Sequence, residues 1–399
     1  MEVGRELPGR FVAGDPLRAI AALAVLSWHA AFLGLAAAGL QGGIGPNLDI
    51  AVVYGNPVGD VLRVGALGVY LFFVLSGYLI ARPFVRAYIT HGKRPRLRRY
   101  ARNRVLRIYP AFLVVCALLL VIYGTLGLDA GQTLGILLLT DIAGAGWSQH
   151  IAHAWSLSVE VAFYVAVPLF FLSLGAISGR VRTPAARAAL LAAIALAAGA
   201  ASLASSFNGA IYGTLVGEFW AFTPGLLLAI AEPFAAPRLA GRARVGRIAL
   251  GAALAGIVLF LSFLPLVRLA GGGAGKLLSL FAAGLVIGAP LVAQWAGVRP
   301  WRVLDNRLAH WLGERSYPIF LLHWPIAWEV SQLVADTGWG AKKVLLGTLL
   351  ITLALTLVAS DLLHRAVERP VLRRRARTAP APAKPQPEPA PAKPQPATA

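Results

Sequence analysis

Long apolar stretches alternate with short polar segments along most of the chain. A helix that crosses the hydrocarbon core of a bilayer needs about 20 mainly apolar residues. Stretches of this kind predict ten transmembrane helices, at residues 17–40, 64–84, 104–124, 155–175, 186–205, 211–231, 248–266, 276–296, 314–333 and 343–365. The apolar run at 131–143 is too short to span, so we expect it in a loop or a re-entrant segment.

Composition and charge agree with this pattern and add an orientation. Hydrophobic residues make up 58% of the chain and charged residues only 14%, whereas about a quarter of a soluble domain is charged. If the ten helices alternate across the bilayer, 32 of the 37 lysines and arginines fall on one side. The positive-inside rule places that side in the cytoplasm. The sequence therefore predicts an all-α integral membrane protein of about ten transmembrane helices, with both termini cytoplasmic.

Two parts of the chain differ in character. Residues 1–375 form the predicted polytopic membrane domain, and residues 376–399 form a proline-rich tail in which Ala-Pro-Ala-Lys-Pro-Gln-Pro occurs twice. Such a tail is expected to be extended and disordered in the cytoplasm. The net charge of +20 does not indicate nucleic-acid binding, because the cations are dispersed over membrane loops. No Cys/His cluster has the spacing of metal ligands, so we expect no metal site.

The first apolar run carries an ionisable residue near its middle. His29 would lie inside the bilayer, where a titratable side chain is costly and a functional role is the default hypothesis. Arg18 lies eleven positions earlier, close to three helical turns, so both side chains share one face. We expect Arg18 near the cytoplasmic surface and His29 roughly 16 Å deeper.

The third and fourth predicted helices carry polar groups on one face each. Arg104 and Arg107 are three residues apart, and two guanidinium groups on one side suit a phosphate ligand. Snorkelling arginines that only set topology are the alternative. Ser156, Glu160 and Tyr164 follow at four-residue steps along the next helix. A carboxylate within a membrane needs a partner or a water-filled cavity, so Glu160 is a candidate functional residue.

Two further segments stand out. Ser76-Gly77 in the second predicted helix permits close contact with another helix, which alone is weak support for a site. The ninth predicted helix contains Tyr317 and His323, the second imidazole predicted within the membrane. A hydrogen-bonded structural histidine beside the Pro325 kink and a substrate contact are both compatible with His323.

In this order, the motifs resemble the acyltransferase-3 family of integral membrane O-acyltransferases. The motifs that carry the resemblance are Arg18 with His29, Leu71-Phe72-Phe73-Val74-Leu75-Ser76-Gly77-Tyr78, Arg104-x-x-Arg107-Ile-Tyr-Pro, Trp155-Ser-Leu-Ser-x-Glu160, and Tyr317 with His323-Trp-Pro. One position departs from the pattern, because the family often has a second acidic residue where this chain has Val161.

The resemblance implies transfer of an acyl group, usually acetyl, from cytoplasmic acyl-coenzyme A to a hydroxyl of a sugar, a cell-envelope glycan or a glycosylated small molecule. His29 is then the expected general base, and Glu160 is expected to orient its imidazole. Arg104, Arg107 and Arg18 are assigned to the acyl-coenzyme A donor. Further substrate contacts are expected from five residues: Ser76, Ser156, Tyr164, Tyr317 and His323.

Two other functions remain open from the residues alone. Membrane histidines and carboxylates also build proton relays, so a proton-coupled secondary transporter is the main alternative. A membrane scaffold whose proline-rich tail recruits partners is the second. In each case we expect a multi-pass protein of the cell membrane in contact with lipids, and the alanine-, glycine- and arginine-rich composition hints at a bacterial inner membrane.

Overall fold

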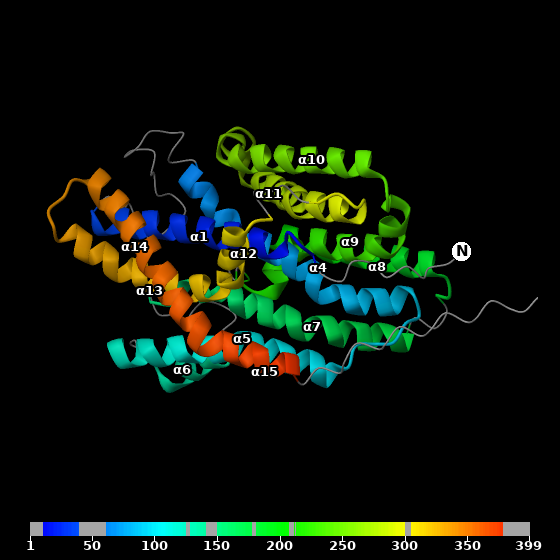
Figure 1. Cartoon of the computed structure of the whole chain (residues 1–399), viewed down its shortest axis with the longest axis horizontal. Helices are drawn as coiled ribbons and strands as arrows, with labels where there is room; N and C mark the ends of the chain where they lie inside the picture. The colour runs from blue at the N-terminus through cyan, green and yellow to red at the C-terminus, as the bar shows by residue number, and fades with distance from the viewer. Residues whose placement is uncertain are drawn as a thin grey trace, which may run out of the picture.

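The computed structural model describes residues 11–39, 61–124, 128–140, 150–177, 181–206, 211, 213–299 and 305–377. Within these ranges the regular elements are helices, and no strand occurs. The long helices are α1 (Gly14–Ala37), α4 (Gly68–Ile89), α5 (Leu97–Tyr123), α7 (Trp155–Ile177), α8 (Pro184–Ser205), α9 (Leu215–Leu239), α10 (Ala243–Leu261), α11 (Phe263–Trp295), α13 (Ser316–Ala335) and α14 (Ala341–Leu363). Figure 1 shows how these helices bundle side by side.

Shorter elements connect or extend the bundle. They are η1 (Gly65–Leu67), α6 (Ala130–Leu137), η2 (Ala152–Ala154), α12 (Arg307–Glu314), the π-helical turn η4 (His364–Glu368) and α15 (Arg369–Arg377). The tail predicted at 376–399 lies outside the described residues, apart from its first two positions, which close α15. The division into a membrane domain and a tail therefore stays a prediction.

The predicted fold class, an all-α integral membrane protein, is confirmed. Among the described residues, nine helices are long and apolar enough to cross a bilayer. The span predicted at 314–333 forms α13, a 20-residue helix that is not among these nine. This helix packs against α1, α5 and α14. Because neighbouring helices rather than lipid cover much of its surface, α13 tolerates the polar residues that lower its hydropathy.

The apolar run predicted at 131–143 begins within α6, which has only eight residues and cannot cross a bilayer. Ile136 of this helix is buried against α5, in a cluster that includes Cys116 and Leu119. The Tyr109 hydroxyl of α5 donates to the Leu138 carbonyl at 3.0 Å. The short helix therefore lies along α5 instead of forming a span of its own.

Helices α4 and α9 approach each other backbone to backbone. A Cβ on Gly77 would overlap the Phe222 carbonyl, and a Cβ on Gly225 would overlap the Val74 carbonyl. Stacked rings of Phe73, Phe222 and Phe163 continue the contact, with centroids 4.6 Å and 4.2 Å apart. Glycine is needed at both positions because no side chain fits between the two helices.

An ion pair joins the same two helices further along. Arg82 of α4 donates from Nε and Nη2 to the two carboxylate oxygens of Glu232 of α9, at 2.6 Å and 2.5 Å. The Tyr78 hydroxyl adds a third hydrogen bond, to Oε2 of Glu232 at 3.1 Å. A bidentate, fully hydrogen-bonded pair is the form in which buried charges are tolerated. It fixes the register of α4 on α9.

We expect Gly225→Ala to destabilise the protein by about 1–3 kcal/mol, because the added methyl must separate α4 from α9. Gly251→Ala is the matched control, since its Cβ would meet nothing within 4 Å and alanine favours a helix. Unfolding by denaturant in detergent micelles measures both variants. Equal stability of the two variants would contradict this account of the α4–α9 contact.

Candidate functional site

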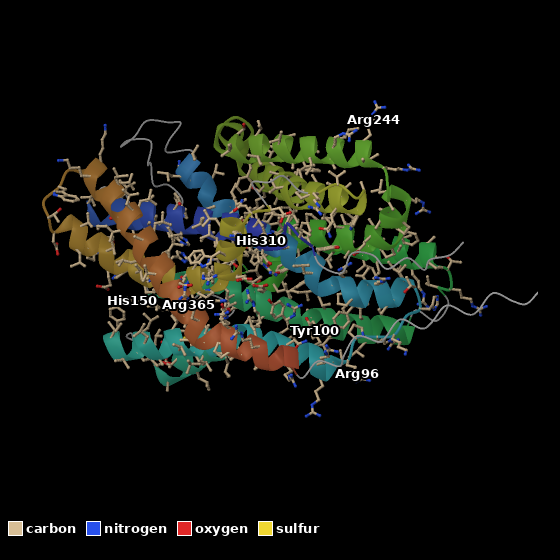
Figure 2. All side chains as sticks on the ribbon, in the orientation of Figure 1. Arg96, Tyr100, His150, Arg244, His310 and Arg365 are labelled. Atoms are coloured by element: carbon tan, nitrogen blue, oxygen red, sulfur yellow. The ribbon has the colours of Figure 1, made fainter. Side chains whose placement is uncertain are left out.

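A large cavity of about 1710 Å³ opens at the end of the bundle where α5 begins and η4 meets α15. Its wall holds ten arginines and three acidic residues: Arg18, Arg96, Arg99, Arg104, Arg107, Arg307, Arg315, Arg365, Arg369 and Arg373, with Asp15, Asp305 and Glu314. Figure 2 labels four lining residues: Arg96 and Tyr100 at the start of α5, His310 of α12 and Arg365 of η4. The excess of cations makes this basic cavity suited to an anionic ligand.

A second, smaller pocket of about 80 Å³ lies deeper in the bundle. Residues of α1, α4, α5, α7 and α13 line it. Arg18, Arg104 and Arg107 line both this inner pocket and the basic cavity. The three arginines that the sequence assigned to one ligand therefore meet at the junction of the two spaces. Arg104 and Arg107 are thus accessible from both spaces.

Each arginine at the junction has a contact that fixes its direction. The Arg104 guanidinium lies 5.5 Å and 5.0 Å from the ring centroids of Tyr100 and Tyr164. Arg107 Nη1 donates to Glu368 at 3.3 Å, and Arg18 Nη1 to Asp15 at 3.4 Å. Stacked and paired guanidinium groups are held ready for a ligand and lose less freedom when one binds.

Glu160 lines the inner pocket with Ser76, Ser156 and Tyr164, four of the residues that the sequence singled out. Its Oε1 accepts from the Ser76 hydroxyl at 2.5 Å and from the Tyr164 hydroxyl at 2.7 Å. The Ser156 hydroxyl turns elsewhere, to the His153 carbonyl at 3.3 Å. The carboxylate is thus stabilised by two hydroxyl groups and faces the junction arginines.

His29 lies beside the other membrane imidazole. Its Nδ1 is 2.8 Å from Nε2 of His323, and the two rings stack at an angle of 9° with centroids 5.1 Å apart. This differs from the predicted contact between Glu160 and His29, because Glu160 bonds to Ser76 and Tyr164 instead. Sequence gives the depth and face of each residue, but it does not tell which helices are neighbours.

Aromatic rings enclose the histidine pair. Trp324 meets the His29 ring edge to face at 4.7 Å, and Phe320 packs against His323 at 5.9 Å. Phe320 also lines the inner pocket, together with Phe72, whose ring lies 6.4 Å away. Phe320 therefore lies at the boundary between the inner pocket and the imidazoles.

Tyr317 connects the pocket to α5. Its hydroxyl donates to the Ile108 carbonyl at 2.9 Å, and the Arg107 guanidinium lies 5.8 Å from its ring centroid. The ring lines the inner pocket while the hydroxyl is engaged by the backbone. Its predicted contact with substrate would therefore be made through the ring.

Sequence reasoning assigned no role to His153. This ring is only 4% exposed and lies 5.0 Å from the His323 ring, which makes a cluster of three imidazoles with His29. It also stacks on Trp324 at 6.0 Å. The signal available in the sequence was its place two residues before Trp155 of the Trp-Ser-Leu-Ser motif.

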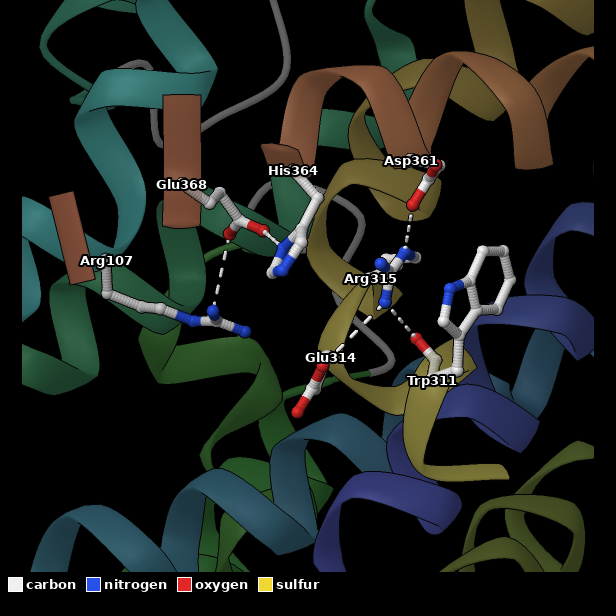
Figure 3. Close-up of polar contacts among 7 residues, drawn as sticks. All are labelled: Arg107, Trp311, Glu314, Arg315, Asp361, His364 and Glu368. Atoms are coloured by element: carbon white, nitrogen blue, oxygen red, sulfur yellow. Dashed lines mark hydrogen bonds and ion pairs between the residues drawn. The ribbon is translucent and has the colours of Figure 1, made fainter. Parts of the chain in front are cut away.

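The π-helical turn η4 supplies the partner of Arg107. Figure 3 shows Glu368 between His364 and Arg107, with one carboxylate oxygen toward each. The His364 Nδ1 to Glu368 Oε2 distance is 2.8 Å, and Glu368 is 4% exposed. A π-helical turn is rare and often occurs at a functional site. Here it turns a buried carboxylate toward the mouth of the inner pocket.

A second network in Figure 3 holds Trp311 against the wall of the basic cavity. Arg315 Nε donates to Asp361 at 2.7 Å, and its Nη1 donates to the Trp311 carbonyl at 3.0 Å. The Arg315 guanidinium lies 4.2 Å from the Trp311 ring centroid. The indole is partly exposed and lines the cavity, so it forms a rigid aromatic platform there.

Another aromatic cluster lies near the far end of α13. The Tyr123 hydroxyl donates to Glu329 at 2.5 Å, and the His150 ring stacks on Tyr123 at 4.0 Å and meets Trp328 at 5.5 Å. Burial lowers the pKa of His150, and the negative charge of Glu329 partly opposes this. Rings of α13 thus extend from the inner pocket, past the imidazoles, to the end opposite the basic cavity.

Among the described residues, no group of three or more His, Cys, Asp or Glu side chains could hold a metal ion. The polar groups at the site are arginines, hydroxyls, a carboxylate and imidazoles. This set suits recognition of an anion and transfer of a proton.

Comparison with known proteins decides the family. The family model of the acyltransferase-3 domain, described as an acyltransferase domain, matches residues 14–365. The chain belongs to the acyltransferase-3 family. No curated protein and no solved structure matches it. Membership covers nearly the whole helical bundle, so this bundle is a multi-pass membrane acyltransferase.

Proposed function

We propose that this acyltransferase-3 protein moves an acetyl group from acyl-coenzyme A to a hydroxyl of a sugar, a cell-envelope glycan or a glycosylated small molecule. The observation that carries the proposal is the shared wall of the two cavities. Arg18, Arg104 and Arg107 stand where a basic cavity meets an inner pocket, below the imidazole of His29. A donor with an anionic head and a long neutral arm fits that order.

The basic cavity suits the coenzyme A head, which carries a diphosphate and a phosphorylated ribose. Guanidinium groups bind phosphates through bidentate, charge-assisted hydrogen bonds. The cavity lies at the arginine-rich end of the bundle, the end that the positive-inside rule places in the cytoplasm, where acyl-coenzyme A is found. We place the protein in the cell membrane of a bacterium.

The inner pocket supports a short acyl group. Its volume of about 80 Å³ has room for only a few water molecules. An acetyl group on the pantetheine arm fits such a space, whereas a long fatty acyl chain would have to displace the packed rings of Phe72 and Phe320. We therefore favour acetyl-coenzyme A as the donor.

The chemistry assigned to His29 is general base catalysis. Its imidazole takes the proton of the acceptor hydroxyl as the oxygen forms a bond to the thioester carbonyl carbon. The carbon–sulfur bond then breaks, and the proton passes from the imidazole to the departing sulfur. The products are an ester and free coenzyme A thiol, and no further reactant is consumed.

The acceptor is proposed to approach from the opposite end of α13. Trp328, His150 and Tyr123 offer ring faces there, and Glu329 offers a carboxylate. Aromatic faces stack on the apolar faces of sugar rings while carboxylates accept their hydroxyl groups. Donor and acceptor would then enter from opposite ends and meet at the imidazoles.

The adenine of the donor is assigned to Trp311. The other aromatic ring of the basic cavity with comparable size, Tyr100, is already covered by Arg104 at 5.5 Å and Phe84 at 5.1 Å. The indole of Trp311 has Arg315 against its ring and keeps exposed surface in the cavity. A planar base can stack on such a platform.

Removing the base tests the reaction. Purified protein given acetyl-coenzyme A and a panel of monosaccharides should release free thiol and form an ester, and His29→Ala should lower that rate by about 10² to 10⁴. Calorimetry should show that the variant still binds acetyl-coenzyme A. A transporter would move solute without consuming thioester. A scaffold would keep its function in His29→Ala and lose it when residues 376–399 are removed.

Arg104→Ala and Arg107→Ala should each weaken acetyl-coenzyme A binding, because each removes a charge-assisted hydrogen bond worth about 1.5–3 kcal/mol, or about 10- to 100-fold in Kd. Arg244→Ala is the control: Arg244 is an exposed arginine on α10 that does not line the basic cavity (Figure 2). Titration calorimetry measures Kd. An equal loss of affinity in the control would show that general surface charge attracts the donor.

Trp311→Ala should raise KM for acetyl-coenzyme A by about tenfold, since stacking of a base on an aromatic ring contributes about 1–3 kcal/mol. Acetyl-pantetheine lacks the nucleotide, so its KM should not change. Trp311→Phe keeps a ring, so its KM for acetyl-coenzyme A should lie between those of the native protein and Trp311→Ala. Equal rises in KM for both donors would place the adenine elsewhere.

A further inference from the structure

We infer that His323 is a positioning residue that selects the tautomer of His29, so that Nε2 of His29 is the proton-accepting atom. The inference rests on the proposed function only where it calls that atom the catalytic base. The proton positions themselves belong to the resting protein. They follow from three distances and from the hydrogen-bonding capacity of each group.

Two backbone carbonyl groups fix the position of the proton on His323. Its Nδ1 lies 2.7 Å from the Phe320 carbonyl oxygen and 3.1 Å from the Ile319 carbonyl oxygen. A carbonyl oxygen can only accept, and its second lone pair remains available when the first serves the helix. Nδ1 of His323 must therefore carry a hydrogen. In a neutral ring this leaves Nε2 unprotonated, as an acceptor.

The bare Nε2 of His323 in turn determines which nitrogen of His29 carries the proton. Nε2 of His323 lies 2.8 Å from Nδ1 of His29, a normal hydrogen-bond length. Because the His323 nitrogen has no hydrogen, the hydrogen between them must belong to His29 Nδ1. A neutral His29 then keeps its only free lone pair on Nε2. The pairing leaves one atom of this imidazole able to take a proton.

His323 stays neutral in the resting protein. Its side chain is 0% exposed, and an isolated charge is very costly to bury. The side chains in contact with it are His29 of α1, His153 of η2 and Phe320 of its own helix, none of which is a carboxylate. A charged His323 would donate from Nε2, and His29 would then lose its free lone pair.

Exposure divides the roles of the two imidazoles. His29 keeps accessible surface, whereas His323 has none. Only His29 can therefore touch a substrate, and the predicted substrate contact of His323 is replaced by a role that acts through His29. When His29 gains a proton, its Nδ1 hydrogen still donates to His323. The neutral partner thus stabilises the imidazolium without placing a second charge in the membrane.

Two substitutions at His323 separate tautomer selection from packing. Glutamine places an amide oxygen near the position of Nε2 and can accept from His29, whereas leucine fills space and accepts nothing. His323→Gln should keep kcat within about tenfold of the native value, and His323→Leu should lower kcat by about 10² to 10⁴. KM for acetyl-coenzyme A should change in neither variant. Equal kcat values for the two would overturn the inference.

Nitrogen NMR of protein labelled at the histidine rings, reconstituted in lipid, reads the tautomer directly. The His29 signals are those lost in His29→Ala. We expect Nδ1 of His29 to be protonated and Nε2 to be bare in the native protein, with the opposite tautomer in His323→Leu. A native His29 protonated at Nε2 would overturn the inference even if leucine disturbs the fold.

The same pair of measurements separates this inference from the proposed function. If native protein releases no thiol from acetyl-coenzyme A while the NMR signals place the hydrogen on Nδ1, the proposed reaction fails and tautomer selection stands. If thiol is released and the hydrogen is on Nε2, the reaction stands and the role of His323 fails.

Discussion

The cost of leaving a charge without a partner inside an apolar bundle governs this protein. Three carboxylates of the bundle, Glu160, Glu232 and Glu368, each receive at least two hydrogen bonds from side chains of other residues. At Glu232 the partner is a half-buried arginine that donates from two nitrogens to both carboxylate oxygens, and the pair holds two helices together. Where the partners face a cavity, as at Glu160 and Glu368, the same rule leaves polar groups beside a space that a ligand can enter.

The kind of polar side chain changes along the axis of the bundle. Arginines crowd the wall of the basic cavity, three of them line the inner pocket with hydroxyls and one carboxylate, and imidazoles lie beyond the ring of Phe320. The cations are therefore concentrated at the end of the bundle that opens to water. That order suits the proposed reaction, because recognition of an anionic donor and removal of a proton make opposite demands on the surroundings.

The sequence predicted the helical class, and among the described residues nine of its ten predicted spans are helices long and apolar enough to cross a bilayer. It also predicted which polar residues share a helix face. The i to i+4 spacing of Glu160 and Tyr164 predicted a shared helix face, and the structure adds a hydrogen bond between the two side chains. The sequence did not predict contacts between helices. His29 and His323 are 294 positions apart, and Glu160, which was expected to contact His29, bonds to Ser76 instead. Periodicity reports depth and direction within one helix, whereas the choice of neighbour depends on packing over the whole bundle. Glu232 was missed because its arginine partner looked like one more topology-setting cation.

Gly77 follows Ser76 in the chain, and this adjacency links two features that otherwise look unrelated. Ser76 donates to Glu160, while Gly77 rests on the backbone of α9. The distance between α9 and the Ser76 side of the inner pocket thus depends on the absence of a side chain at Gly77. A mutational scan that measured activity alone would group Gly77 with the catalytic residues. Gly77 contributes no functional group, and its effect is only to let the two helices approach closely.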